Sequence, residues 1–268
     1  MPAGFGQRGR TIAPGNAARL ERMDELRVMT WNLRGAGRPD LDEVAGRILA
    51  SHADVVGLQE IRRGQASKLA GRLRWHHHWA LKHLAYGPLI WFAEGMAVLS
   101  PHPLPKHRRV VLNPGTSAWT YRRRIAQRVV MEAPHGPMVV YNAHLASHPA
   151  PEERERQSGV VADVVRGQVD SDPTAIALVI GDLNAADEPS TLAPLVAAGL
   201  RDAWVIAEDC PVRSAAGFTN PAVDPYQRLD YVMVPDTLSV DGVDVPGGGE
   251  DWAALSDHLP VVARLRIR

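Results

Sequence analysis

Six short polar motifs stand at long intervals along the chain, and each carries a carboxylate, carboxamide or imidazole. They are Thr30-Trp31-Asn32, Leu58-Gln59-Glu60, Asn142-Ala143-His144, Gly181-Asp182-Leu183-Asn184, Arg228-Leu229-Asp230-Tyr231 and Ser256-Asp257-His258. Each lies beside an apolar run of the kind that forms a buried strand. Because ligands of α/β proteins bind beyond the ends of strands, we expect the six motifs to form one site.

Two of the motifs point to specific chemistry. Asp182 and Asn184 follow a nearly all-apolar stretch at 175–180, and residues two apart on an extended segment project the same way. The alternative is a turn that caps a helix near Pro189. Asp257 offers an acid for a hard cation, and His258 an imidazole for a phosphate or for another acid, which Asp230 would supply. An Asp–His pair fixes the tautomer of the ring and favours the imidazolium.

The remaining polar residues are ambiguous when each is taken alone. Asn32 precedes a glycine-containing turn, Glu60 could emerge at the surface, and His144 could be an ordinary hydrogen-bonded histidine. If the carboxylate of Glu60 is buried, it would need to pair with a cationic side chain or bind a metal ion. The chain has no cysteine–histidine zinc pattern, no phosphate-binding glycine loop followed by Lys-Ser/Thr, and no Gly-x-Ser-x-Gly elbow.

Apolar periodicity predicts one mixed α/β domain from residue 26 to 268, preceded by a mobile arm at 1–25. The helix expected at 40–51 has an apolar stripe of Leu41, Val44, Ala45, Ile48 and Leu49. Further helices are expected at 64–73 and 151–169. Strands are expected at 26–31, 53–58, 96–99, 109–112, 125–132, 138–143, 175–180, 229–234, 239–243 and 259–264.

Composition limits the class of protein. The 268 residues carry 30 basic and 30 acidic side chains, so no overall charge draws the protein to nucleic acid. The single cysteine, Cys210, excludes an intramolecular disulfide and favours a reducing compartment. No apolar stretch is long enough for a signal peptide or a membrane span, so we expect a cytoplasmic protein without stable membrane insertion. Nothing in the chain predicts a protein partner.

The charges are unevenly distributed along the chain. Residues 95–131 include seven lysines and arginines and no acid, whereas residues 229–263 include seven acids and no lysine or arginine. Each block could be an ordinary solvated face. The alternative is a phosphate-facing wall beside a cation-binding wall.

Taken in order, the six motifs resemble those of the endonuclease/exonuclease/phosphatase superfamily over about residues 27–266. Residues 95–100 resemble its Gly-Asn-Ala-x-Leu-Ser strand, with Met96 in place of the usual asparagine, and Arg154 and Gln157 resemble its Arg-x-x-Gln. The resemblance implies a four-layer α-β-β-α sandwich of two mixed sheets flanked by helices, the DNase-I-like fold. It also implies a site in the cleft at one edge of the sandwich.

The resemblance further implies a role for each motif residue. Asn32, Glu60 and Asp257 would hold Mg²⁺ or Mn²⁺. Asp182 would orient and deprotonate the attacking water, Asn184 and His144 would hold phosphate oxygens, and Asp230 would pair with His258, which contacts the phosphate. We expect Arg122, Arg124 and Arg154 to contact the substrate.

These roles predict a metal-dependent phosphoesterase that hydrolyses phosphodiesters, with nucleic acid or a nucleotide-like diester favoured. One alternative is a phosphomonoesterase or a phospholipase-type hydrolase acting on inositol or lipid phosphates. The other is a non-catalytic phosphate-binding module, against which the six intact motifs argue.

Overall fold

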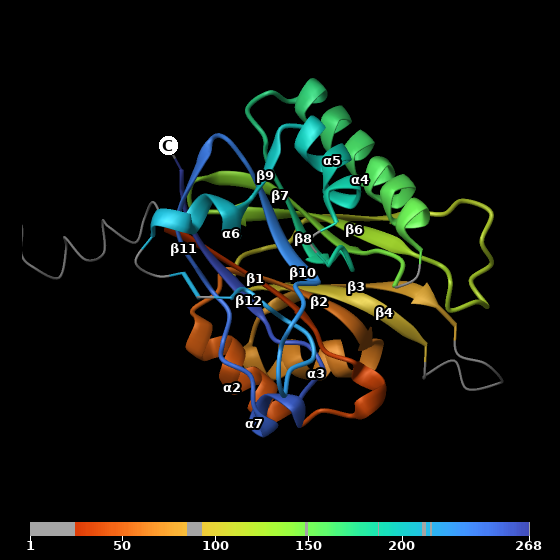
Figure 1. Cartoon of the computed structure of the whole chain (residues 1–268), viewed down its shortest axis with the longest axis vertical. Coiled ribbons are helices and arrows are strands. Elements are labelled where there is room, and N and C mark those ends of the chain that lie inside the picture. The colour runs from red at the N-terminus through yellow and green to blue at the C-terminus, as the bar shows by residue number, and fades with distance from the viewer. Residues whose placement is uncertain are drawn as a thin grey trace, which may run out of the picture.

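Two six-stranded mixed β-sheets lie face to face between two layers of helices in the computed structural model (Figure 1). The structure describes residues 25–84, 93–147, 150–186, 188–210, 213–214 and 216–267. The four-layer sandwich expected from the motifs is thereby confirmed. The predicted arm at 1–25 lies outside the described residues except for Glu25.

The first sheet has the strand order β11-β12-β1-β2-β4-β3. Its strands are β1 (Glu25–Asn32), β2 (Val55–Arg62), β3 (His76–His83), β4 (Glu94–Ser100), β11 (Leu238–Asp244) and β12 (Val261–Ile267). On its outer face lie α2 (Leu41–Ser51) and α3 (Arg63–Leu73), with the short helices η1 (Gly35–Gly37) and α7 (Glu250–Ala253) near the same side.

The second sheet has the order β5-β6-β7-β8-β10-β9. Its strands are β5 (Lys106–Val111), β6 (Ile125–Ala133), β7 (Gly136–His144), β8 (Ile176–Asp182), β9 (Leu200–Asp202) and β10 (Asp230–Pro235). Its outer face is covered by α4 (Pro151–Ser171) and α5 (Pro189–Ala197) (Figure 1). The short helices α6 (Ala203–Ile206) and η3 (Ala207–Asp209) pack near β10 and β11.

The central strands are apolar on both faces because each sheet is buried on both sides. In β1, Val28 packs into the layer between the sheets, whereas Met29 and Trp31 pack against the helices outside. Burial of each such side chain contributes roughly 1.5–3 kcal/mol. This two-sided burial makes the strands that lead to the polar motifs rigid supports.

Helix α2 illustrates how local sequence sets an element. The side chain of Asp40 accepts hydrogen bonds from the backbone N–H groups of Asp42 and Glu43 and so caps the N-terminus. Val44, Ala45 and Ile48 of the predicted stripe are buried, but Leu49 is 51% exposed. The apolar face is therefore narrower than the sequence suggested.

The expected strands did not include β3 and β9. β3 is an edge strand that begins with three histidines, and most of its side chains are only half-buried, so it lacks the apolar signature of the central strands. β9 has only three residues. β5 begins at Lys106 instead of residue 109, because basic side chains at a sheet edge can remain in solvent.

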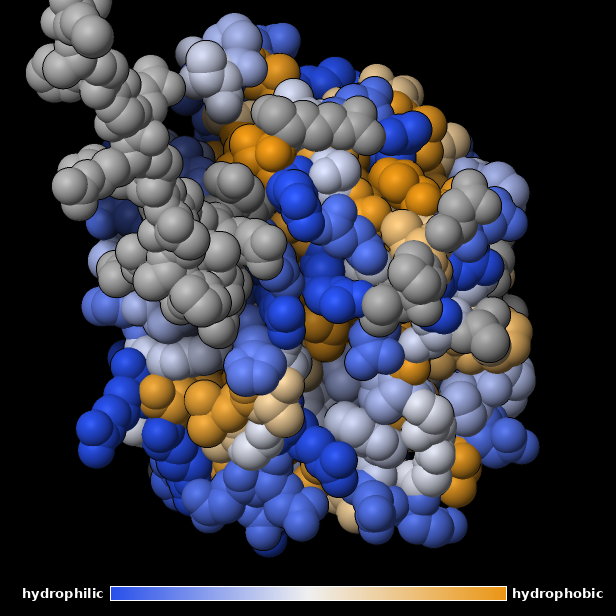
Figure 2. All heavy atoms as spheres, turned by 90° about the vertical axis from the view of Figure 1, so that its left-hand side faces the viewer, coloured by the Kyte–Doolittle hydropathy of each residue, from blue (hydrophilic) through white to orange (hydrophobic). Residues whose placement is uncertain are grey.

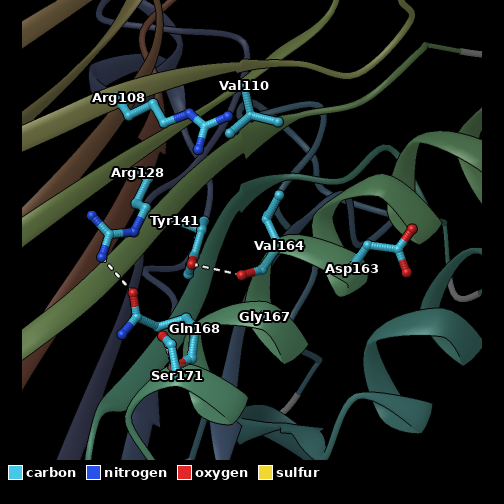
Figure 3. Close-up of a pocket in the computed structure, with 9 residues that line it drawn as sticks. All are labelled: Arg108, Val110, Arg128, Tyr141, Asp163, Val164, Gly167, Gln168 and Ser171. Atoms are coloured by element: carbon cyan, nitrogen blue, oxygen red, sulfur yellow. Dashed lines mark hydrogen bonds between the residues drawn. The ribbon is translucent and has the colours of Figure 1, made fainter.

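The basic block at 95–131 does not form one wall. Arg128 lies on the side of β5 and β6 that α4 covers (Figure 3). Arg108, on the edge strand β5, lines hollows on both sides of the sheet, and Arg109 donates to the carbonyl of Leu81 in β3. Arg124 lies beside His144 in the group of polar side chains around Asp182, which is called the cleft below. The acidic block is divided as well, since Asp236 pairs with Arg201, and Asp241 with Arg266.

Among the described residues no helix is both long enough and apolar enough to span a membrane. On the face shown in Figure 2, hydrophobic residues form small groups separated by hydrophilic side chains.

Candidate active site

Strand register in the second sheet brings three motif residues side by side. His144 at the end of β7 lies opposite Asp182 at the end of β8, and Asp230 at the start of β10 lies opposite Asp182 on its other side. Gly181 permits this close approach: its φ is +144°, and a Cβ there would lie 1.9 Å from the carbonyl oxygen of Ala143. The second sheet therefore places a carboxylate between an imidazole and another carboxylate.

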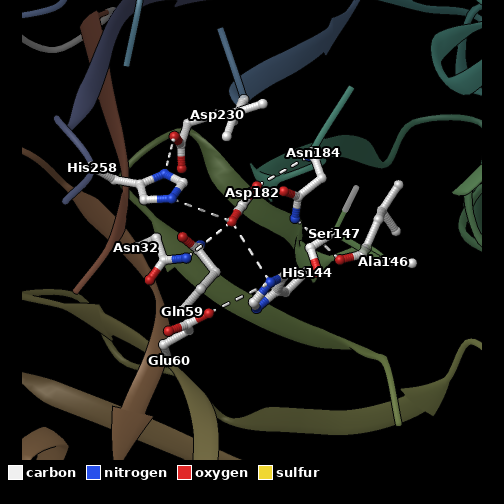
Figure 4. A network of polar contacts seen from close by, with 12 residues as sticks. Asn32, Gln59, Glu60, His144, Ala146, Ser147, Asp182, Asn184, Asp230 and His258 are labelled. Carbon is white, nitrogen blue, oxygen red and sulfur yellow. Dashed lines mark hydrogen bonds and ion pairs between the residues drawn. The ribbon is translucent and has the colours of Figure 1, made fainter. Parts of the chain in front are cut away.

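The first sheet contributes Asn32 from the end of β1. Its Nδ2 donates to Asp182 Oδ2 at 2.9 Å, across the gap between the sheets (Figure 4). The segment that precedes β12 is held to the same strand end, because Trp31 Nε1 donates to the carbonyl of His258 at 2.9 Å and Ser256 Oγ donates to that of Asn32 at 2.6 Å. These bonds fix His258 relative to Asp182.

His258 forms the Asp–His pair that the sequence suggested. Its Nδ1 lies 2.8 Å from Asp230 Oδ2, and its Nε2 lies 4.0 Å from Asp182 Oδ2. Burial opposes a charge on the ring, but the Asp230 and Asp182 carboxylates outweigh burial and raise the pKa of His258 to about 10. The ring is therefore an imidazolium whose Nε2–H points toward the centre of the site.

Asp182 is the buried carboxylate at that centre. Burial, with a contribution from Asp230, raises the pKa of Asp182 to about 7, although His258 and the hydrogen bond from Asn32 work in the other direction. The backbone N–H of Asn184 donates to Asp182 Oδ1 at 3.0 Å and closes a turn, but this turn does not cap a helix, because α5 has Glu188 at its N-cap position. That turn orients Asp182 and so belongs to the site.

His144 and Arg124 line the opposite side of the cleft. His144 Nε2 lies 3.6 Å from Asp182 Oδ2 and 3.9 Å from Glu60 Oε1, and Arg124 Nη1 lies 3.4 Å from the same nitrogen. Burial, together with the positive charges of Lys82 and Arg124, holds the pKa of His144 well below its usual range. His144 is thus neutral, and Arg124 is a buried cation.

A β-bulge turns Glu60 into the cleft. The pairing of β2 with β4 shifts between Leu58 and Ile61, and Glu60 adopts a φ of +53°, which is rare for a residue with a side chain. Such backbone strain accumulates at functional positions. Burial, and then the charge of Glu94, raises the pKa of Glu60.

Lys82 is a residue of this region that the sequence analysis missed. A second bulge lies in β3 between Leu81 and His83. Both bulges face Gly95 of β4, which pairs with Ile61 of β2 on one side and with Leu81 on the other. The side chain of Lys82 is 3% exposed, and its Nζ lies 2.5 Å from Glu94 Oε1. Lys82 lowers the pKa of His144, which places its charge near the cleft. Its sequence signal was a single lysine among the histidines and apolar side chains of residues 76–84.

A divalent cation fits the oxygen-rich side of the cleft. Glu60 and Asp257 repel each other electrostatically, and Asn32 adds an amide oxygen at the end of β1. Among the described residues, Asp182, Asp230 and His258 also hold possible ligand atoms within 4.8 Å of one another. We do not assign the metal to that group, because Nδ1 of His258 already faces Asp230 and an imidazolium has no lone pair to donate.

Three further predicted residues have contacts with groups other than Asp182. Arg154 is buried, donates to both carboxylate oxygens of Glu188 and to the carbonyl of Ala146, and supports the loop after β7. Arg122 lies at the surface beside Glu153 of α4. Asp257 is at the rim, 3.4 Å from Arg34, with 40% of its side chain exposed.

The chain belongs to the endonuclease/exonuclease/phosphatase family, a family of phosphoesterases, whose model matches residues 29–258. No curated protein matches it by sequence. Several solved structures are similar. An endonuclease/exonuclease/phosphatase from Beutenbergia cavernae is 24% identical, with a TM-score of 0.68, over 91% of this chain and 72% of that one.

Two other similar structures are described by an activity or a name. Mannosyl-6-phosphatase of Bacteroides thetaiotaomicron is 19% identical with a TM-score of 0.73, over 90% of this chain and 99% of that one. Truncated TDP2 of Caenorhabditis elegans is 21% identical with a TM-score of 0.66, over 90% and 97%. At these identities the likeness shows the fold.

Proposed function

We propose that the protein is a Mg²⁺- or Mn²⁺-dependent phosphodiesterase in which Asp182 activates the attacking water. The observation that carries the proposal is the placement of Asp182. This carboxylate is buried between His144, His258 and Asn32, and its pKa of about 7 suits a general base at neutral pH.

The chain's own residues divide the work around the phosphate. Protonated His258, held by Asp230, donates to a phosphoryl oxygen as that oxygen gains negative charge. Neutral His144 and the amide of Asn184 bind further oxygens, and Arg124 offsets the negative charge of the ester. Asn32 keeps one oxygen of Asp182 directed into the cleft.

Asn32, Glu60 and Asp257 would hold the divalent cation, whose chemistry is that of a Lewis acid and a charge sink. Their oxygens suit a hard cation. Arg154 is not among the proposed substrate contacts, because Glu188 occupies its guanidinium.

A phosphomonoesterase is the second candidate. A monoester carries more negative charge than a diester, and two buried cations, Lys82 and Arg124, contribute to the cleft. The similarity to a mannosyl-6-phosphatase fold is consistent with this alternative.

One experiment tests both candidates. Hydrolysis of a bis-aryl phosphate and of the matching aryl monophosphate is measured with Mg²⁺, with Mn²⁺ and with chelator, for wild type and for Asp182→Ala. Metal-dependent turnover of the diester that is lost in the variant supports the proposal. Turnover of the monoester alone would support the second candidate, and diester turnover that survives in Asp182→Ala would refute the role of that residue.

A further inference from the structure

The loop between β5 and β6, residues 113–124, combines exposed aromatic side chains with arginines beside the cleft. It projects at the right of Figure 1, in yellow-green. Trp119 and Tyr121 are 54% and 55% exposed, among the most exposed large hydrophobic side chains of the described residues. The loop ends at Arg124, whose guanidinium reaches His144. The aromatic rings are therefore only a few residues from the candidate active site.

Hydrogen bonds give this loop a defined shape. The side chain of Asn113 donates to the carbonyl of Arg122 at 2.8 Å and accepts from the backbone N–H of Arg124 at 2.9 Å, which closes the base of the loop. The N–H of Leu84, just after β3, donates to the carbonyl of Ala118 at 2.7 Å. The two aromatic residues are thus exposed on an anchored loop. Exposed apolar side chains of this kind often mark a binding surface.

A basic groove continues from the same place along the edges of the two sheets. β3 is the edge strand of the first sheet and β5 that of the second. None of the described residues that line the groove is acidic; they are Arg63, Ser67, His77, His78, Trp79, Ala80, Leu81, His107, Arg108 and Arg109. From Lys82 back to His77 the strand spans roughly 17 Å, at about 3.3 Å per residue.

Two arginines connect the loop with this groove. Arg109 donates to the carbonyl of Leu81, one residue before Lys82. Burial, and then the positive charge of Arg109, lowers the pKa of Arg123 in the loop. Among the residues that the structure describes, neither guanidinium forms an ion pair with a carboxylate, and Arg123 Nε is buried without a hydrogen-bond partner. These side chains offer positive charge that the fold does not neutralise.

We propose that loop 113–124 and the groove between β3 and β5 form a binding site for single-stranded nucleic acid, which would flank the scissile phosphodiester. Proteins that bind single strands combine a basic groove for phosphates with aromatic rings on which bases stack. In this protein Trp119 and Tyr121 are the stacking platforms, and Arg123 and Arg109 contact phosphates. The inference rests on the proposed function and narrows its substrate.

A single strand fits these features better than the other polyanions. In a duplex the faces of the bases are covered by stacking, so the two exposed rings would have no partner. A membrane surface is flat, whereas the cations of β3 and β5 line a groove. An isolated phosphate ester would leave this groove without a ligand.

The test measures binding without catalysis. Fluorescence anisotropy follows a labelled twelve-residue oligothymidylate in excess chelator for wild type, Trp119→Ala, Trp119→Phe, Arg109→Gln and Arg128→Gln. Arg128 is the matched control, because it lies on the opposite side of the same sheet and donates to Gln168 of α4 (Figure 3). A duplex of equal length and vesicles of phosphatidylserine and phosphatidylcholine are the competing ligands.

We expect Trp119→Ala to weaken binding about tenfold and Trp119→Phe to restore most of the affinity. Arg109→Gln should lower the slope of log K against log salt by about 0.7, whereas Arg128→Gln should leave both affinity and slope unchanged. Three results would each overturn the inference. Trp119→Ala could bind with the affinity of wild type, or Arg109→Gln and Arg128→Gln could lose affinity equally. The third is that the protein binds vesicles but not the oligonucleotide.

The two proposals fail separately. Hydrolysis of a bis-aryl phosphate without any binding of the oligonucleotide would leave the phosphodiesterase intact and remove the nucleic-acid site. If the protein binds the oligonucleotide through Trp119 but has no hydrolase activity, the nucleic-acid site stands and the phosphodiesterase is removed.

Discussion

Two ion pairs, Arg154 with Glu188 and Asp230 with His258, differ in how fully their hydrogen-bonding groups are used. In the pair behind the cleft, every guanidinium nitrogen of Arg154 donates, to Glu188 or to the carbonyl of Ala146. In the pair at the cleft, Asp230 Oδ1 accepts no hydrogen bond from the described residues, and His258 Nε2 is 4.0 Å from the nearest carboxylate.

This is the difference that we expect between a structural pair and the pair that we propose to be catalytic. A buried polar group without a partner costs free energy, so a fold retains such groups where a ligand completes them. The saturated pair of Arg154 and Glu188 can only support the backbone. The incomplete pair of Asp230 and His258 has a donor left for a substrate. The following variants test that distinction.

The largest expected effect is at the carboxylate that both histidines face. Asp182→Ala should lower kcat/KM by about 10³-fold or more, because the general base and the anchor of Asn32 are lost together. Circular dichroism and a urea titration should show a folded protein. The matched control is Asp163→Ala, an exposed carboxylate of α4 that pairs with Arg166 and should remain fully active. An unfolded Asp182→Ala protein would show that this carboxylate is structural.

Asp230→Asn should lower kcat by about 10²-fold with a small change in KM, because His258 loses the carboxylate that keeps it protonated. The wild-type imidazolium persists until pH approaches about 10. The alkaline limb of the pH–rate profile should therefore move to lower pH in the variant. An unchanged limb would exclude His258 as the proton donor.

Arg154→Met should affect stability rather than catalysis. Glu188 loses its partner but is partly exposed, so we expect the free energy of unfolding to fall by about 1–3 kcal/mol, less than for a fully buried pair. The activity per folded molecule should stay close to that of wild type. Arg154→Met combined with Glu188→Gln should recover part of the loss. A fall in kcat without a fall in stability would instead return Arg154 to the substrate contacts that the sequence suggested.

The smallest effect concerns the pH dependence of stability. The folded pKa of His258, about 10, lies above the value near 6.5 expected in the unfolded chain. Its contribution to stability is therefore complete below about pH 6.5 and is lost as pH rises through about 10. The difference in Tm between wild type and Asp230→Asn, measured without metal, should shrink over that range. A constant difference would mean that the pair does not share a proton in the way described.

Local patterns in the chain predicted most of the architecture. Apolar runs such as 175–180 marked the central strands, and the polar residues that follow them were expected at one edge of the sheets. Asn32, Asp182 and Asp230 do lie together there. The pattern failed for β3, because an edge strand with half-buried side chains has no continuous apolar run.

Arg154 and Lys82 have contacts that the sequence did not reveal, and for the same physical reason. Arg154 matched the Arg-x-x-Gln spacing of the family. That spacing does not reveal that its guanidinium pairs with Glu188, 34 residues away in the sequence. Lys82 was missed because a bulge redirects it toward Glu94. Both outcomes depend on contacts between segments that are distant in the sequence.

By itself the sequence determined the residue types at the strand ends and the order of strands and helices, since both follow from periodicity and local chemistry. Only the tertiary structure decided the protonation states. The pKa values of Asp182 and His258 arise from burial and from charges on other strands. The tertiary structure also separated Arg109 from Arg128: Arg109 of β5 lines the groove beside β3, whereas Arg128 of β6 lies on the side that α4 covers. This separation depends on how the two sheets and α4 pack.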